Sequence, residues 1–158
     1  PTPRGSALNA FVAVALVLVG VALLPAWRPI DPGLGAPAGL LTFAPSGVTA
    51  ALRERAGPSD RVWNPQPWGS WLEFAVPAPA YAFDSRIEVI PAQAWADGDV
   101  VAAAGPGWEA ILDRYGVTII VTQAPSTSPL TGPLRADGGW DLAFADADGA
   151  VWMRAVHR

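Results

Sequence analysis

The sequence predicts an α/β protein: an N-terminal transmembrane helix, then a small α/β sandwich that closes with a C-terminal β-hairpin. Three observations lead to this fold class. Residues 7–26 form an uncharged apolar run, strand-like and helix-like segments alternate from residue 46 onwards, and an Asp-Gly pair near the C-terminus separates two strand-like runs. The predicted organisation is a transmembrane helix over residues 1–27, a linker over 28–45 and an α/β domain over 46–158.

The apolar run contains no charged residue and a single Asn. Its twenty residues would cover about 30 Å as an α-helix, the thickness of the hydrocarbon core of a bilayer. Trp27 follows where an aromatic side chain would anchor a span at the membrane surface. A signal sequence and a buried core helix are the alternatives, but the first has a shorter apolar region and the second usually has a polar face. We therefore expect a membrane span.

Arginines flank this run on both sides, at Arg4 and Arg28, so the arginine count does not predict its orientation. Because the chain starts at Pro1 and not at Met, we expect a fragment or processed form with further membrane helices before the run. The remainder has nine arginines against fourteen acidic residues. This acidic balance argues against nucleic acid as a partner. The absence of Cys excludes disulfides and Cys-ligated metals.

Residues 28–45 are rich in Pro and Gly, which is typical of a linker. A short helix is predicted from Ser46, whose hydroxyl would cap it, to the Gly57-Pro58 pair. Further helical segments are predicted at 69–75, 92–96, 97–104 and 107–116. Strands are predicted at 61–63, 81–83, 117–121, 140–144 and 150–156. Gly116 would end its helix in a left-handed conformation, and Gly149 would supply a positive φ in the hairpin turn.

The sequence offers little catalytic or metal-binding chemistry. Its single histidine, His157, is next to the end, and no phosphate-loop, dinucleotide or hydrolase motif is present. The two Asp-rich stretches, 97–99 and 146–149, lack the ligand spacing and final Glu of a calcium loop. We interpret the first as capping acids at a helix start and the second as a turn. No metal, cofactor or catalytic residue is therefore predicted.

Asp84 and Arg86 follow the predicted strand 81–83. Ligands of open α/β sheets usually bind beyond the carboxyl ends of strands, so this pair could hold a sugar or a phosphate. The alternative is an ion pair that fixes the loop. Trp68 and Trp71 lie on one side of a helical turn, with Gly69 allowing a close backbone approach. Core packing is the first interpretation of these tryptophans, followed by contact with the membrane and by stacking on a sugar ring.

Several segments resemble a recurring series in bacterial polytopic membrane proteins. Residues 61–64 (RVWN), 68–72 (WGSWL) and 83–86 (FDSR) match a strand ending in Asn, then W-G-G-Y-L, then a strand ending in D-G-R. Residues 108–121 and 140–154 fit the two motifs that follow, W-x-x-x-L-x-x-Y-G-V-x-x-x-x and W-x-L-x-x-x-D-x-x-x-x-V-x-x-R. The series resembles the soluble C-terminal domain of proteins similar to lipid-linked-sugar glycosyltransferases of the GT-C type. Ser70, Trp71 and Ser85 depart from its usual Gly, Tyr and Gly.

The resemblance implies an accessory domain at the cell membrane, on its extracytoplasmic side. Such a domain would cover the membrane site of a polyprenyl-phosphate-sugar-dependent glycosyltransferase or contact the acceptor glycan. Its partners would be the membrane, the preceding transmembrane domain and a lipid-linked sugar or glycan, and the catalytic acid would lie outside this chain. The alternative is a non-enzymatic, membrane-anchored interaction module. The candidate ligand-binding residues are Asn64, Trp68, Trp71, Asp84 and Arg86.

Overall fold

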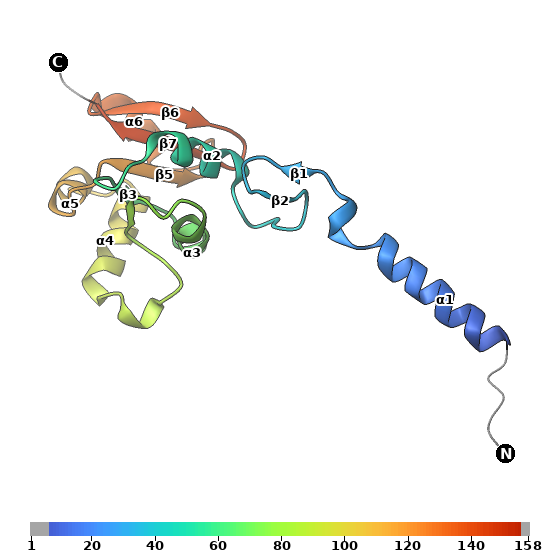
Figure 1. Ribbon diagram of the computed structural model, residues 1–158. Helices are drawn as coiled ribbons and strands as arrows, with labels where there is room; N and C mark the ends of the chain where they lie inside the picture. Colours follow the sequence, from blue (N-terminus) through green and yellow to red (C-terminus); the bar gives the residue numbers. More distant parts are fainter. Residues whose placement is uncertain (1–6, 156–158) are drawn as a thin grey trace.

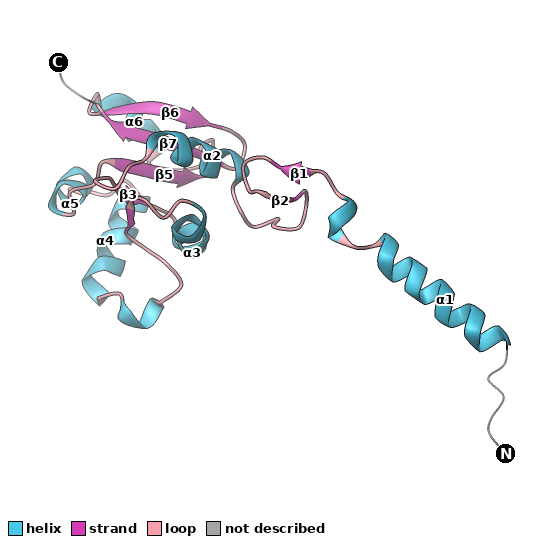
Figure 2. Cartoon of the chain, in the orientation of Figure 1, coloured by secondary structure: helices cyan, strands magenta, loops and turns pink. Residues whose placement is uncertain are grey.

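A five-stranded mixed sheet forms the centre of the α/β domain in the computed structural model, which describes residues 7–155 (Figures 1 and 2). The strand order is β4-β3-β5-β7-β6. β3 runs parallel to β4 and β5, and β7 runs antiparallel to β5 and β6. The bounds are β3 Arg61–Trp63, β4 Ala80–Tyr81, β5 Ile119–Gln123, β6 Trp140–Ala145 and β7 Gly149–Arg154.

Helices cover both faces of this sheet, and alternate strand residues point to opposite faces. Val62 and Ile119 belong to one buried cluster, which also contains residues of α2 (Ser46–Arg55) and α3 (Gln66–Ala75). Trp63 and Ile120 belong to a second cluster, built with residues of α4 (Ala92–Ala102), α5 (Trp108–Arg114) and α6 (Thr131–Asp137). The predicted α/β class is therefore confirmed, as three layers with the sheet in the middle.

The chain changes winding direction at β3. It leaves β3 through α3 to reach β4 on one side, and it returns through α4 and α5 to β5 on the other side of β3. The helices of these two connections lie on opposite faces of the sheet. The carboxyl ends of β3 and β5 therefore form the point where strand order reverses, which is where open α/β sheets usually leave a crevice.

The predicted C-terminal hairpin is confirmed, but the reason given for Gly149 is wrong. Gly149 does not have a positive φ. The turn is held by the Asp146 carboxylate, which accepts hydrogen bonds from the backbone N–H groups of Asp148 and Gly149, both at 2.9 Å. A Cβ on Gly149 would lie 2.8 Å from a methyl group of Val48. Glycine is needed here because α2 packs closely against β7.

Helix α1 (Ala7–Ala22) projects away from the domain, and none of its residues is buried (Figure 1). Its sixteen residues extend about 24 Å at 1.5 Å per residue. Among residues 7–155, no helix combines the length and the apolar character needed to cross a membrane. The predicted span is therefore not confirmed. Arg4, His157 and the outer ends of the predicted segments 1–27, 46–158 and 150–156 lie outside the described residues.

The predicted linker is partly ordered into secondary structure. A 3-10 turn, η1 (Pro25–Trp27), is followed by a two-stranded ribbon of β1 (Ile30–Asp31) and β2 (Ala36–Pro37). The capping role predicted for Ser46 is wrong, because its hydroxyl donates to the Asp31 carboxylate at 2.6 Å. This bond ties the linker to the first residue of α2.

Two helical segments predicted within 92–104 form the single helix α4, so Asp97 and Asp99 are interior residues and not capping acids. Gly98 lets this helix pack closely against Phe83, because a Cβ there would lie 2.9 Å from the Phe83 ring. Helix α6 and the 3-10 turn η2 (Ile87–Val89) were not predicted. Gly116 ends its helical segment at φ 64°, as predicted.

Candidate functional site

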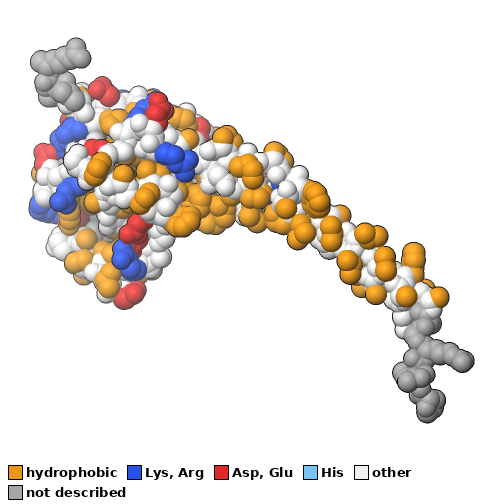
Figure 3. All heavy atoms as spheres, viewed as in Figure 1, with side chains coloured by type: hydrophobic (Ala, Val, Ile, Leu, Met, Phe, Trp, Pro, Cys, Tyr) orange, Lys and Arg blue, Asp and Glu red, His pale blue; other side chains and the backbone are white. Residues whose placement is uncertain are grey.

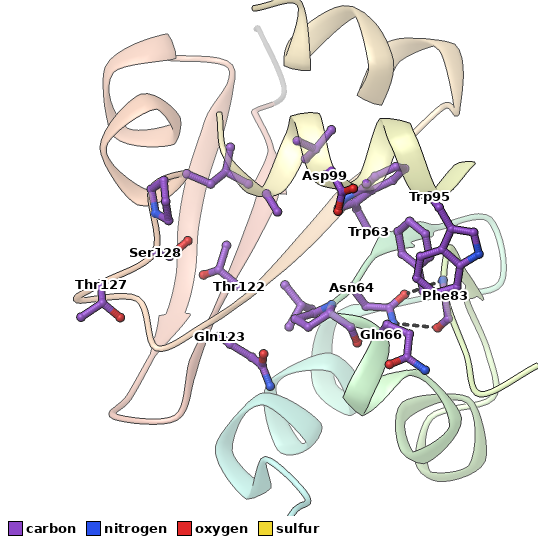
Figure 4. Close-up of a pocket in the computed structure, with 17 residues that line it drawn as sticks. Trp63, Asn64, Gln66, Phe83, Trp95, Asp99, Thr122, Gln123, Thr127 and Ser128 are labelled. Carbon is purple, nitrogen blue, oxygen red and sulfur yellow. Dashed lines mark hydrogen bonds between the residues drawn. The ribbon is translucent and has the colours of Figure 1, made fainter. Parts of the chain in front are cut away.

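A pocket of about 360 Å³ opens at the carboxyl ends of β3 and β5, and we call it the switch-point pocket (Figure 4). Its lining comes from four regions: the ends of these strands, the segment after β4, helix α4 and the loop that leads to α6. Aromatic and polar side chains share this lining. The residues used below are Trp63, Asn64, Phe83, Trp95, Asp99, Thr122, Gln123 and Ser128.

Asn64 ties the end of β3 to the segment after β4. Its side-chain amide donates to the Phe83 carbonyl at 2.8 Å, and its carbonyl oxygen accepts from the N–H groups of Ala82 and Phe83 at 3.1 and 3.3 Å. Asn64 is 2% exposed. The Ala82 N–H still donates to the Val62 carbonyl at 3.0 Å, and beyond this bond the Asn64 side chain takes the place of the strand ladder. β4 therefore ends at Tyr81 and not at residue 83 as predicted. Asn64 thus positions the pocket wall and has little free hydrogen-bonding capacity for a ligand.

Three aromatic rings form one side of the pocket. The rings of Trp63 and Phe83 meet nearly edge to face with centroids 5.1 Å apart, and those of Phe83 and Trp95 lie 5.4 Å apart. Trp63 and Phe83 are each 5% exposed, whereas Trp95 is partly exposed. Trp95 is therefore the ring of this wall with a surface left for a ligand.

Polar groups without protein partners come from the other sides of the pocket. The Thr122 hydroxyl is buried and has no hydrogen-bond partner within residues 7–155. Among residues 7–155, the side chains of Asp99, Gln123 and Ser128 likewise neither donate nor accept a hydrogen bond within the protein. Figure 4 shows Thr122 and Gln123 on β5, with Ser128 and Asp99 on separate elements around them. The arrangement offers several hydrogen-bonding groups opposite an aromatic face.

The pocket is uncharged apart from one carboxylate. Of the residues described as lining it, Asp99 is the one that carries a charge, and it is exposed. No arginine lies among them. A pocket of this kind disfavours phosphates and other anions, which require arginine, lysine or a row of backbone N–H groups. The ligand classes that suit this pocket are therefore neutral or cationic molecules.

Asp84 and Arg86 form the ion pair that the sequence offers as the alternative to a ligand site. The Arg86 Nε donates to the Asp84 carboxylate at 2.7 Å, as does the Arg86 backbone N–H. The hydrogen bonds from Arg86 hold the pKa of the Asp84 carboxyl below its usual value. The Arg86 guanidinium also lies 3.4 Å from Glu73. Neither Asp84 nor Arg86 lines the switch-point pocket.

Trp68 and Trp71 also lie outside the pocket lining. Trp68 is 7% exposed and packs in the cluster beneath α2 and α3. Trp71 is partly exposed, donates its indole N–H to the Thr49 hydroxyl at 3.0 Å and contacts the rings of Phe43 and Phe74. Of the five residues predicted to bind a ligand, Asn64 alone lines this pocket, and it does so as a support.

Asp97 forms a second polar cluster that the sequence did not reveal. It is 5% exposed and accepts hydrogen bonds from Tyr115 at 2.8 Å, Arg114 at 2.5 Å and Gln93 at 3.0 Å. The bond from Tyr115, followed by that from Arg114, lowers the pKa of the Asp97 carboxyl. The cluster joins α4 to the end of α5. Among residues 7–155, no three His, Asp or Glu side chains are grouped so that they could hold a metal.

Sequence reasoning missed Thr122, Gln123, Asp99 and Ser128 as pocket residues. A usable signal was present, because polar residues directly follow the buried run 117–121, where a parallel strand would end. The side chains of α4 carried no such signal, since their position depends on tertiary packing. No family model, curated protein or solved structure matches this chain.

Proposed function

We propose that this chain is a membrane-attached accessory domain of a polytopic protein resembling a polyprenyl-phosphate-sugar-dependent glycosyltransferase. In this proposal α1, with Leu23 to Trp27, lies in the bilayer at the cell membrane. The α/β domain stands on the extracytoplasmic side and covers the membrane site or contacts a glycan. The chain itself supplies no catalytic acid.

The observation that supports membrane attachment most strongly is the exposure of α1. The helix has no charged residue and no buried residue, and Leu8, Phe11 and Leu16 are each more than two-thirds exposed. Hydrophobic side chains cover it from end to end in Figure 3. A helix that is apolar all round requires an apolar environment, and the domain does not provide one. Because α1 alone is shorter than the hydrocarbon core, the apolar residues Leu23 to Trp27 would complete the crossing.

Exposed aromatic side chains where the linker meets α3 give further support. Phe43 and Phe74 are 59% and 79% exposed, and both contact Trp71. Figure 3 shows hydrophobic atoms continuing from α1 onto the part of the domain next to it. Aromatic rings are enriched at membrane–water interfaces. This surface suits contact with lipid headgroups or with a preceding membrane domain.

The same surface also favours the alternative, a non-enzymatic membrane-anchored module that binds another protein. The coding sequence upstream of Pro1 separates the two functions. Eight or more further apolar spans are expected for the transferase-like protein. A short N-terminal tail would favour the non-enzymatic module, with α1 as its only membrane anchor.

Single-cysteine labelling tests the membrane placement. Because the chain has no native Cys, the introduced thiol is the only one in it that can react. Val12 in α1 and Ala147 in the β6–β7 turn are both exposed within the protein. We expect a membrane-impermeant maleimide to label the Ala147→Cys variant in intact cells and to leave Val12→Cys unlabelled. Equal labelling of both positions would contradict insertion of α1. Labelling of Ala147→Cys only after lysis would contradict the extracytoplasmic side.

A further inference from the structure

We infer that the switch-point pocket binds a neutral carbohydrate, with Trp95 as the stacking surface and with Asp99, Thr122, Gln123 and Ser128 as hydrogen-bonding groups. This inference deepens the proposed function, because it names the site and the class of ligand. The inference rests on the proposed function only in assuming that the sugar is part of a glycan at the membrane; the observations that support the pocket do not depend on it.

The first support is the position and size of the pocket. It lies where the strand order reverses, between the carboxyl ends of β3 and β5. This is the general ligand position in open α/β sheets. Its volume of about 360 Å³ falls at the small end of the range for ligand pockets. Such a space suits a small sugar and not a polymer.

The second support is the unpartnered hydroxyl of Thr122. The residue is 5% exposed, and because it lies two residues after Ile120 on β5, its side chain points to the same face of the sheet as Ile120, which is the pocket face. Leaving a buried hydroxyl without a partner costs free energy. A change of χ1 rotamer carries the hydroxyl to another of the three staggered positions on Cβ, where it can bond a ligand on this wall. A ligand with hydroxyl groups would provide the missing bond.

The third support is the match between the remaining lining and a sugar ring. A pyranose has an apolar face of C–H groups and an edge of hydroxyls. Trp95 can meet the face, while the amide of Gln123, the hydroxyl of Ser128 and the carboxylate of Asp99 can meet the edge. Donors and acceptors are both present, as alternating sugar hydroxyls require.

The lining also separates a carbohydrate from competing ligand classes. A phosphate would meet the Asp99 carboxylate and no basic side chain. A quaternary ammonium needs several open ring faces, but Trp63 and Phe83 are each 5% exposed and pack against each other. Uncharged polar groups outnumber the single carboxylate. A neutral sugar therefore fits the pocket best.

Saturation-transfer difference NMR on the full chain in lipid nanodiscs tests this inference. The probes are methyl α-D-mannopyranoside, N-acetylglucosamine, sodium phosphate and tetramethylammonium chloride. Nanodiscs avoid detergents with sugar headgroups, which would compete for the pocket. We expect signal from at least one of the two sugars and none from phosphate. Signal from tetramethylammonium without signal from either sugar would overturn the inference, and so would the absence of all signals.

Two threonines provide a matched pair of variants for locating the binding. Thr131, like Thr122, is buried and has a hydroxyl without a described partner, but it does not line the pocket. Removing either hydroxyl by substitution with Val should leave the fold intact, since no hydrogen bond is lost. We expect Thr122→Val to weaken sugar binding about three- to tenfold, the value of one hydrogen bond. Thr131→Val should leave binding unchanged.

Trp95→Ala should abolish detectable binding, whereas Phe74→Ala, which removes an exposed ring outside the pocket, should not. Unchanged binding in both Thr122→Val and Trp95→Ala would overturn the assignment to this pocket. The cysteine-labelling result does not depend on this outcome. Correct labelling without sugar binding would therefore reject the carbohydrate site and leave the membrane placement standing.

Discussion

Gly69 shows how one small residue determines where the wall of the switch-point pocket lies. An added Cβ would overlap the backbone carbonyl of Phe83, the same group that accepts the hydrogen bond from Asn64. The sequence predicted this close approach from the glycine between two tryptophans. It could not predict the partner, because Phe83 is brought there by the pairing of β3 with β4.

Gly69→Ala is expected to lower the free energy of unfolding by about 1–3 kcal/mol, because the backbone of α3 must move away from Phe83. Gly132→Ala is the control. Gly132 also lies in a helix, but a Cβ there meets nothing within 4 Å. Because Gly132 precedes Pro133, whose ring disfavours a helical conformation for a residue with a Cβ, we expect no stabilisation and a change in the free energy of unfolding within about 0.5 kcal/mol of zero. Urea unfolding of both full-length variants provides the measurement, and equal effects would contradict the packing argument.

Asp97 is expected to make the domain sensitive to acid. Hydrogen bonds from Tyr115 and Arg114 lower its pKa in the folded state below the ordinary value of 3.8. Its contribution to stability is therefore complete above pH 3.8 and is lost as pH falls below that value.

Thermal unfolding of Asp97→Asn and wild type from pH 7 to pH 2.5 checks this expectation. The variant should be less stable at pH 7 and should lose less stability in acid than wild type. Asp141→Asn, at an exposed position of β6, should follow the wild-type curve. Parallel curves for Asp97→Asn and wild type would contradict a role for this carboxylate in acid unfolding.

At the scale of elements, helix α1 has the clearest sequence signal and the least tertiary support. Its apolar, uncharged residues were recognised directly, yet none of them is buried in the protein. Helix α6 has a weak sequence signal and strong tertiary support. Its Gly and Pro residues obscure the helical pattern, whereas Leu130 and Leu134 pack in the core. Sequence patterns therefore revealed elements with strong local periodicity. They missed elements that depend on tertiary contacts.

A charge placed in the middle of α1 should disrupt membrane attachment. Val14→Arg puts a guanidinium near the centre of the helix, at a cost of about 2.5–3.5 kcal/mol for insertion. Val89→Arg is the matched control, since Val89 is 66% exposed and Val14 is 59% exposed. We expect the first variant to leave the carbonate-washed membrane fraction and the second to remain in it. Release of both variants, or of neither, would argue against α1 as the anchor.

At the scale of the whole molecule, the α/β class and the C-terminal hairpin were predictable because they depend on strand periodicity and turn residues. The strand order was not, since β3 lies between β4 and β5 through two crossover connections on opposite faces. That order places the pocket between β3 and β5. The sequence instead predicted a ligand site at Asp84 and Arg86, in the loop that follows β4 at the edge of the sheet.

Hydrogen exchange of the full chain in lipid nanodiscs tests most directly whether α1 lies in the bilayer while the α/β domain stands outside. An isolated helix of this length is marginal in water, so its amides would exchange quickly there. We predict that α1 amides in nanodiscs remain protected for hours, as do those of β5, while the amide of Ala147 in the β6–β7 turn, which is exposed and donates no hydrogen bond to residues 7–155, exchanges within seconds. Exchange of the α1 amides as fast as the amide of Ala147 would contradict the placement of α1 in the bilayer.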